Sequence, residues 1–453
     1  MELLDRREII ENLKYLVQAQ DRPKLKNILI DIHPADIADI IRDMEIDERA
    51  FIFNLLDLET RSDVVLELDE VTRDQLIEVL GPEELSQLVD QMDSDDATDV
   101  LSDLPEETAK KVLARLDFKD RAEVEKLIVH DEETAGGIMA LEFVAVYTHE
   151  TVDDAIQKIR QKAQEVEEIY NVYAIDEKNQ LAGVVPLKRL LLAKHNQLIR
   201  DIMNSDVIAV TLEKDQEEVA RMFRRYDLVS IPVVDHENRL VGRITIDDIV
   251  DVLHEEANED MHRMAGIADE EIPQEMSTLR ISRFRLPWLL VSFVGEIFSA
   301  FIMRSFEATI NQIVATAFFI PLIMAMGGNT GIQASTIVVR SIALEEGGTT
   351  NRWSRLWREI RVAGMNGLIM GILITTMVII FFTDDPFFGM VVGTSMFFVM
   401  LNAAIVGAVV PYVLHRFNFD PAIATGPFIT TSNDVLGLFI YLSFTVGYLR
   451  WLS

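Results

Sequence analysis

The sequence of 453 residues contains no cysteine, which excludes disulfide bonds, thiolate zinc sites and cysteine nucleophiles. Its eight histidines are scattered, and no His-Glu-x-x-His motif, P-loop or nucleophile elbow is present. No basic stretch of any length occurs, although a protein that neutralises nucleic-acid phosphates needs one. We therefore expect a protein that is not an enzyme and that binds no nucleic acid.

Lysine is missing from the last part of the chain, because residues 281–453 contain ten arginines, nine acidic residues and no lysine. The acidic excess behind the formal net charge of -33 therefore belongs entirely to the first 280 residues. A chain of this length that is 49% hydrophobic predicts two to four folded domains rather than a disordered acidic protein. The first residues lack the apolar core and cleavage site of a signal peptide, so we expect the acidic part in the cytoplasm.

Long apolar runs dominate the chain from Leu286 onward. Each run can cross about 30 Å of hydrocarbon, whereas a buried helix of a soluble protein rarely continues so far without a polar face. The five expected membrane spans are residues 287–309, 313–341, 359–382, 389–414 and 422–449. Arginines flank the 2–3 and 4–5 connections, and the 3–4 connection holds Asp384 and Asp385 without a basic residue. The positive-inside rule then predicts a cytoplasmic N-terminus.

One carboxylate, Asp434, is expected deep in the fifth span, within an unusually polar run that begins at Gly426 and Pro427. Proline cannot donate the backbone hydrogen bond that a helix expects, so carbonyl groups one turn earlier become available. A carboxylate with free carbonyls and hydroxyls is an all-oxygen site suited to a hard cation such as Mg2+ or Ca2+. Two alternatives stay open: Asp434 pairs with Arg304, or it serves as a proton relay.

A second break is expected in span two, where Gly327–Gln333 contains three glycines and an amide. Small residues there indicate either close helix packing or a pore lining, and the sequence favours neither. Glu296 and Asn402 are also polar at membrane depth, but their spacing assigns no role to them.

An internal repeat occupies the middle of the chain. The segment Tyr170–Gly183 recurs as Val229–Gly242 at an offset of 59, and we expect about five extra residues of the first copy in its helix around Gln161–Glu168. Each copy predicts strand, helix, strand, polar turn, strand and helix. This pattern resembles a tandem CBS-domain pair.

CBS pairs often bind adenine nucleotides, with a Thr or Ser and an Asp after the glycine holding the ribose. Thr245 and Asp248 of the second copy fit that pattern. The first copy has Lys188 and Arg189 where the Asp is expected. An adenine nucleotide at the CBS pair is therefore possible but disfavoured.

Short amphipathic helices separated by turn signals are predicted over residues 1–130, as in a helical superhelix. Acidic residues cluster around Asp95 and again along 247–260, the segment that leaves the second CBS copy. Such runs are often solvated helix faces. Seven acids within fourteen residues also repel one another, and a divalent cation would relieve that repulsion. The sequence therefore leaves two interpretations, a solvated face and a cation sensor.

Several motifs together resemble the MgtE family of magnesium channels over essentially the full length. They are Glu133–Met139, Glu256–Gly266, Gly327–Gln333, Asp420–Pro427 and Thr430–Asp434. The resemblance implies a homodimer in a bacterial inner (plasma) membrane, with cytoplasmic N-terminal domains that sense Mg2+. It implies that Asp434 is the pore carboxylate and that Asp420 faces a plug helix at the cytoplasmic mouth. The implied ligands of regulatory Mg2+ are Asp95, Asp99, Asp215, Glu217, Asp227, Asp248, Asp251, Glu256, Glu259 and Asp260.

The expected fold class is a multidomain chain: an all-α helical-repeat N domain (1–130), an α/β tandem CBS pair (131–257), a connecting plug helix (258–280) and a five-helix transmembrane domain (281–453). The expected function is a Mg2+-selective channel in a lipid bilayer, closed by intracellular Mg2+. Two rivals remain. One is a transporter of another divalent cation such as Mn2+ or Co2+, because oxygen ligands alone do not separate these ions from Mg2+. The other is a non-conducting CBS-domain membrane sensor.

Overall fold

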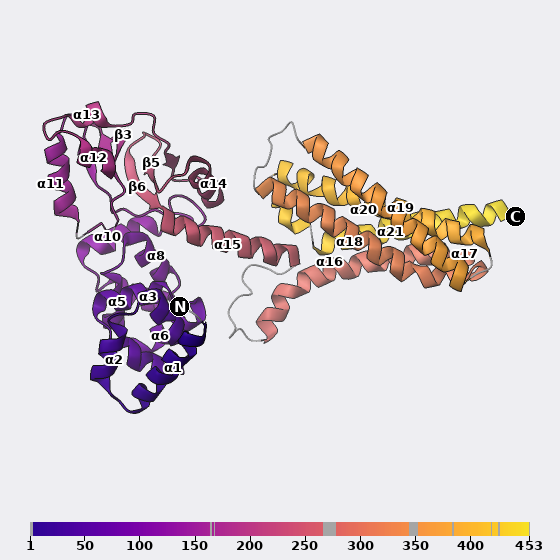
Figure 1. The fold of residues 1–453 in the computed structure, drawn as a ribbon, viewed down its shortest axis with the longest axis horizontal. Helices are drawn as coiled ribbons and strands as arrows, with labels where there is room; N and C mark the ends of the chain where they lie inside the picture. Colours follow the sequence, from indigo (N-terminus) through magenta and orange to yellow (C-terminus); the bar gives the residue numbers. More distant parts are fainter. Residues whose placement is uncertain are drawn as a thin grey trace. The chain divides into compact units, whose positions relative to one another are not determined.

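The structure is a computed structural model that describes residues 3–163, 165–166, 168–265, 278–343, 352–382, 385–417, 419–424 and 426–452. It consists of two compact units, Met1–Glu256 and Ala257–Ser453 (Figure 1).

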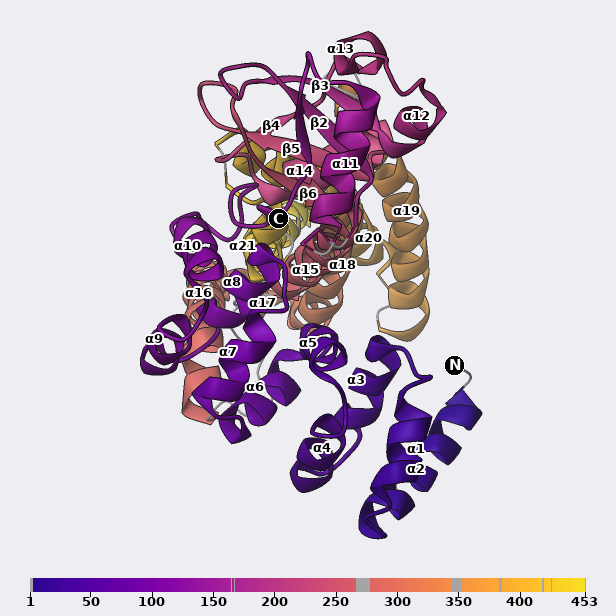
Figure 2. The same cartoon turned by 90° about the vertical axis from the view of Figure 1, so that its left-hand side faces the viewer.

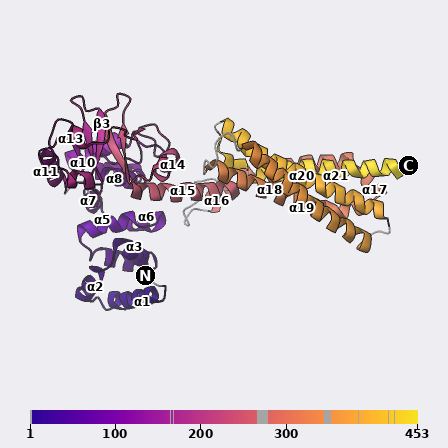
Figure 3. The ribbon, with the colours of Figure 1, turned by 45° about the horizontal axis from the view of Figure 1, so that its top comes forward.

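The first unit begins with short helices that pack in successive layers (Figure 3). They are α1 (Leu3–Gln18), α2 (Arg22–Leu29), α3 (Pro34–Arg42), α4 (Ile46–Phe53), α5 (Leu58–Leu66), α6 (Glu70–Val79), α7 (Pro82–Val89), α8 (Ser94–Ser102), α9 (Glu106–Leu113) and α10 (Phe118–Leu127). Side chains of Asp57 and Asp69 accept hydrogen bonds from backbone N–H groups at the starts of α5 and α6, as N-caps do. Because α3 packs on α5, α5 on α7 and α7 on α9, the buried apolar side chains form one continuous core. This arrangement fits the predicted helical superhelix.

The predicted repeat forms two three-stranded sheets of the same topology (Figure 2). Their elements are β1 (Ala145–Tyr147), α11 (Val152–Lys162), β2 (Asn171–Ile175), β3 (Leu181–Pro186), α12 (Leu187–Leu192), α13 (Ile199–Ile202), β4 (Val210–Thr211), α14 (Gln216–Tyr226), β5 (Ser230–Val234), β6 (Leu240–Thr245) and α15 (Ile246–Ala265). In each sheet the first strand is parallel and the third antiparallel to the middle strand. The pairs Ile175–Leu181 and Val234–Leu240 stand at equivalent positions with the same local irregularity, so the register confirms the offset of 59.

The extra residues of the first copy do not lengthen its helix, as the sequence interpretation expected. α11 and α14 both contain 11 residues. The connection from α11 to β2 covers residues 163–170, whereas that from α14 to β5 covers only 227–229, so the five additional residues follow the helix. Periodicity could not separate the last turn of a helix from a polar connection.

The two CBS copies join through equivalent turns. Asn179 and Asn238 both have φ of 61° in the left-handed region. The N–H of Leu181 donates to the carbonyl of Asn238 at 2.9 Å, and the N–H of Leu240 donates to that of Asn179 at 3.2 Å. The hydroxyls of Tyr173 and Ser230 lie 2.5 Å apart, and burial raises the pKa of Tyr173 to about 12.

The second unit contains five long apolar helices among the residues that the structure describes, which confirms the predicted number of spans. They are α16 (Thr278–Ser305), α18 (Ala315–Ala343), α19 (Arg352–Phe381), α20 (Pro386–Arg416) and α21 (Pro427–Leu452), with the short helices α17 (Glu307–Gln312) and η2 (Pro421–Ala424) between them. α20 packs against α18, α19 and α21, while α16 packs against α21 (Figure 1).

Two expectations about the spans are corrected. The run 327–333 does not break span two, since α18 is continuous from Ala315 to Ala343. The predicted span five, residues 422–449, is divided before Pro427: residues Pro421–Ala424 form η2, and Pro427 is the first residue of α21, where a missing N–H costs no helical hydrogen bond. Asp434 therefore lies two turns into α21 rather than near its middle.

The predicted boundary at residue 258 lies inside α15, which continues from the second CBS copy to Ala265 without interruption. The rest of the predicted plug segment, 266–277, lies outside the described residues.

Candidate cation sites

The intramembrane carboxylate Asp434 has a second carboxylate as its neighbour. Glu296, from α16, lies within hydrogen-bonding reach of the Asp434 side chain on α21. No ion pair joins Asp434 to Arg304 in the described part of the chain. The neighbour of Asp434 is thus an acid that sequence reasoning left without a role.

Close contact between α16 and α21 produces this pairing. A Cβ atom added at Gly295 would come within 1.8 Å of the Thr431 side chain, so only glycine allows the two helices to approach this far. Glu296 follows Gly295 directly and Asp434 lies one turn beyond Thr431. The glycine therefore places the two carboxyl groups side by side.

In the glycine-rich run of α18, Gly327 and Gly331 lie at close helix contacts, whereas a Cβ at Gly328 would meet open space. A Cβ at Gly331 would stand 2.0 Å from Nδ2 of Asn433, and one at Gly407 would stand 2.3 Å from the Gly331 carbonyl oxygen. These contacts bring α18, α20 and α21 together. They support the packing interpretation of the run and place the buried amide of Asn433 beside α18.

Asp420 precedes η2 and accepts hydrogen bonds from two groups. The Ala422 N–H donates to its Oδ1 at 2.8 Å, and Nη1 of Arg263 donates to its Oδ2 at 2.6 Å. Arg263 also forms an ion pair with Glu259 one turn earlier on α15. The segment 257–265 of α15 thus reaches Asp420 through a guanidinium group. Asp260 lies next to Glu259 on the same helix.

Two of the predicted sensor residues, Asp95 and Asp248, come together although they are 153 positions apart in the sequence. Asp95 is 7% exposed on α8. Burial raises its pKa well above the usual value, and the neighbouring acids Asp248, Asp96 and Asp93 raise it further. Burial likewise raises the pKa of Asp248 to about 6, against hydrogen bonds from Thr245 that lower it. These buried carboxyl groups therefore form a site where negative charge, once the groups ionise, is costly without a positive partner.

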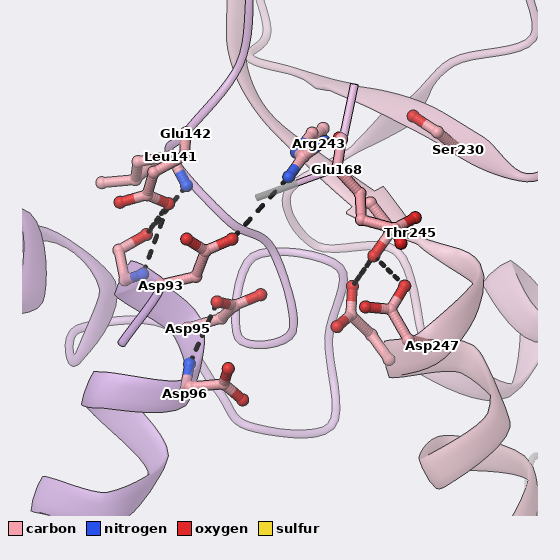
Figure 4. Close-up of polar contacts among 12 residues, drawn as sticks. Asp93, Asp95, Asp96, Leu141, Glu142, Glu168, Ser230, Arg243, Thr245 and Asp247 are labelled. Atoms are coloured by element: carbon pink, nitrogen blue, oxygen red, sulfur yellow. Dashed lines mark hydrogen bonds and ion pairs between the residues drawn. The ribbon is translucent and has the colours of Figure 1, made fainter. Parts of the chain in front are cut away.

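Figure 4 shows how polar contacts hold α8 against the CBS pair around these acids. The Ser94 hydroxyl donates to Glu142 at 2.8 Å and accepts from the Leu141 N–H at 2.8 Å. Arg243, only 4% exposed, lies 3.7 Å from Asp93 and donates to the carbonyl of Glu168. The arginine supplies part of the positive charge that these acids require.

A second group of acids surrounds Asp99. Burial raises the pKa of Asp99 to about 7, and Glu132, Asp103 and Glu255 raise it further. The pKa of Glu255 is also raised, first by burial and then by Asp251. The structure thus adds Asp103, Glu132 and Glu255 to the predicted residues, and no sequence spacing could have joined the first two to α15.

A third group forms around Glu256, whose pKa burial raises and which accepts a hydrogen bond from Gln216 at 2.9 Å. Asp215 and Glu217 lie near it. Asp215 also caps α14 by accepting from the Glu217 N–H at 3.0 Å. Asp227 ends α14 in the left-handed conformation, with φ of 50°.

The side chains as they stand do not form a closed ligand shell. Among the described residues, no three Asp, Glu or His side chains are arranged to hold a metal ion. The structure therefore brings several predicted ligands near one another, and their role as Mg2+ ligands stays a prediction.

The raised pKa values predict how Mg2+ binding depends on pH. A carboxyl group whose pKa is raised stabilises the compact, cation-free arrangement when protonated, and this stabilisation is lost between about pH 4 and about pH 7. Mg2+ must displace these protons, so its apparent affinity should rise with pH over the same range, by up to about tenfold per pH unit for each proton released. Isothermal titration at pH 5.5, 6.5 and 7.5, in buffers of different ionisation enthalpy, measures both quantities. A pH-independent affinity without proton release would contradict this linkage.

Comparisons with known proteins cover both units. The divalent cation transporter family MgtE matches residues 320–444, the MgtE intracellular N domain matches 32–133, and CBS domains match 135–196 and 199–255. The chain is 36% identical to the magnesium transporter MgtE of Thermus thermophilus over 332 residues, which are 72% of this chain and 73% of that protein. It is also 36% identical to the magnesium transporter MgtE of Bacillus subtilis over 336 residues, 74% of each chain.

Two solved structures resemble the N-terminal part. The cytosolic domain of the Mg2+ channel MgtE in complex with ATP aligns with a TM-score of 0.52 and 34% identity over 54% of this chain and 99% of that one. The soluble part of a magnesium transporter aligns with a TM-score of 0.51 and 30% identity over 56% and 99%.

Five apolar helices, a CBS pair and an acidic helical domain define a multi-pass membrane transporter with N-terminal soluble domains. The chain belongs to the MgtE family. Both the resemblance and the fold class expected from the sequence are confirmed.

Proposed function

We propose that this chain conducts Mg2+ across the plasma membrane through a path that passes Asp434. The observation that carries the proposal is a carboxylate on a membrane helix, placed beside a second acid, in a chain whose relatives are named magnesium transporters. Mg2+ loses its water reluctantly, so a carboxylate that holds the hydrated ion through its waters binds it weakly enough to release it. A second copy of the chain would supply a second Asp434, so we include a homodimer in the proposal.

We also propose that intracellular Mg2+ closes the path by binding to the acids of the first unit and of α15. The raised pKa values of Asp95, Asp99 and Asp248 support this: burial is their main cause, neighbouring acids add to it, and a bound cation would stabilise the ionised form that both disfavour. On α15, Glu259 and Asp260 follow these acids toward the membrane unit in sequence. Asp420 would receive the plug segment at the cytoplasmic mouth.

Nucleotide binding stays outside the proposed mechanism. A relative's cytosolic domain has been solved with ATP. Here the hydroxyl of Thr245 already bonds to Asp247 and Asp248, and Arg189 donates to the Ile202 carbonyl at 3.0 Å. An adenine nucleotide at the CBS pair therefore remains a prediction that an ATP titration of the full chain would test.

Divalent-cation uptake into proteoliposomes tests the proposed function. Fluorescent indicators inside the vesicles should report entry of Mg2+, and parallel assays with Mn2+ and Co2+ measure selectivity. Equal entry of Mn2+ or Co2+ would favour the broader divalent-cation transporter. Absence of entry of all three ions would favour the non-conducting sensor.

Labelling of single cysteines tests the orientation, and the natural chain has no cysteine to interfere. By the positive-inside rule, Asp384→Cys should react with a membrane-impermeant maleimide added outside intact cells, and Ser354→Cys should react only after permeabilisation. Ser354 is exposed on α19, so burial would not protect it. The reverse pattern would place the acidic unit outside and would end the intracellular-sensor proposal.

A further inference from the structure

Glu296 is an acidic side chain on a membrane helix with an acidic partner. It is exposed on α16 and lies beside Asp434. A single ionised group at membrane depth costs several kcal/mol, and two adjacent carboxylates repel each other in addition. Such a pair is stable when the two groups share a proton or when a hydrated cation lies against both of them.

The packing of α16 against α21 determines that Glu296 and Asp434 lie near each other. The absence of a Cβ at Gly295 lets α16 approach Thr431, and this approach fixes the neighbouring Glu296 at the level of Asp434. Because Glu296 is exposed while Asp434 is partly buried, the pair is accessible from outside the helix bundle of one protomer.

Two buried polar side chains near this pair in the sequence have no hydrogen-bond partner among the described residues. Ser299 lies one turn after Glu296, on the stripe of α16 that Gly295 packs against α21, and is 7% exposed. Asn433 precedes Asp434 and is 2% exposed, and neither its Oδ1 nor its Nδ2 has a partner. Buried polar groups are normally hydrogen-bonded, and a hydrated cation offers water molecules as donors.

We propose that Glu296 is a second carboxylate of the cation site at Asp434, and that Ser299 accepts hydrogen bonds from the water around the bound ion. The proposal rests on Asp434 being the permeation site. A second carboxylate doubles the negative charge that each protomer presents to the ion. It thereby raises the affinity for divalent over monovalent cations, which is a role in selectivity.

Uptake by Glu296→Gln, Glu296→Asp and Asp434→Asn variants of the full chain tests this. Glu296→Gln should still conduct, with the Mg2+ concentration for half-maximal uptake raised about tenfold, as expected for loss of one charge-assisted contact. Hexaamminecobalt(III) is a stable analogue of a hydrated ion. The concentration that half-inhibits uptake by Glu296→Gln should also be raised about tenfold. Glu296→Asp should restore most of both values because it keeps the charge.

Thr376→Val is the matched control, because Thr376 is exposed on α19 and its hydroxyl bonds only to the Ile372 carbonyl of its own helix. It should leave uptake and block unchanged. Parent-like uptake and block in Glu296→Gln would overturn the proposed role of Glu296. If Asp434→Asn loses transport in the same assay, the proposed function through Asp434 still stands. Normal transport by Asp434→Asn would instead refute the proposed function. If Glu296→Gln elutes as aggregate, Glu296→Ala takes its place. A half-maximal concentration raised about tenfold then supports the proposal, and a parent-like one opposes it.

Discussion

Replacing Asp434 with asparagine is expected to reduce Mg2+ uptake into proteoliposomes by at least about a hundredfold. The substitution preserves the volume of the side chain and removes its charge, and a charged contact is worth roughly 1.5–3 kcal/mol, which corresponds to about ten- to a hundredfold per protomer. Two protomers lose the charge together. Uptake measured with an internal Mg2+ indicator, at several external Mg2+ concentrations, gives the size of the loss.

The fold of the Asp434→Asn variant is checked independently. Asp434 is only partly buried, and the contacts that hold α21 come from its neighbours, including the Tyr441 hydroxyl, which donates to the Thr316 carbonyl at 2.9 Å. The variant should therefore elute at the same volume as the parent and melt within a few degrees of it. A well-folded variant with parent-like uptake would place the permeation path elsewhere in the second unit.

Much of the architecture could be predicted because it depends on local patterns. The five spans follow from the length of apolar runs, and the CBS pair follows from a turn that recurs at an offset of 59. Pro427 indicated an irregularity in span five. Whether a proline kinks a helix or begins one depends on its position relative to the first residue of that helix. At the first residue of α21 it begins a helix, whereas an interior position would have kinked it.

The pairing of Glu296 with Asp434 could not be predicted in this way. The two residues are 138 positions apart, and only the approach of two helices at Gly295 joins them. The acids around Asp99 pose the same difficulty, since Glu132 and Glu255 reach it from distant parts of the first unit. Sequence identifies acidic residues reliably, whereas which of them share a site depends on packing.

Replacing Asp95, Asp99 and Asp248 together by asparagine should make the N domain insensitive to Mg2+. At pH 8 Asp99 and Asp248, whose pKa values burial raises to about 7 and about 6, are largely ionised, and their buried charge destabilises the contact between α8 and the second CBS copy by an amount on the order of a few kcal/mol. Asparagine removes both the repulsion and the ligands. Without Mg2+, the variant should melt several degrees above the parent, as about 1 kcal/mol shifts the melting temperature by roughly 2–4 °C in domains of this size.

Limited proteolysis of the full chain provides the second measurement. In the parent, Mg2+ should protect the cytoplasmic region from cleavage by the protease. Mg2+ binds between the acids with higher affinity in the compact state, so adding it increases the population of that state. In the triple variant, the same protection should be present without Mg2+ and should not change when Mg2+ is added. Transport through Asp434 should persist in the variant and should lose its inhibition by Mg2+ on the cytoplasmic side.

A matched variant separates site-specific effects from a change in net charge. Asp31→Asn, Glu107→Gln and Glu177→Gln remove three exposed acids of the same unit. This control should retain the parent's Mg2+ concentration for protection and for inhibition. If the Asp95, Asp99 and Asp248 variant also retained both concentrations, these three acids would be part of a solvated face, and the Mg2+ that closes the path would have to bind at other residues.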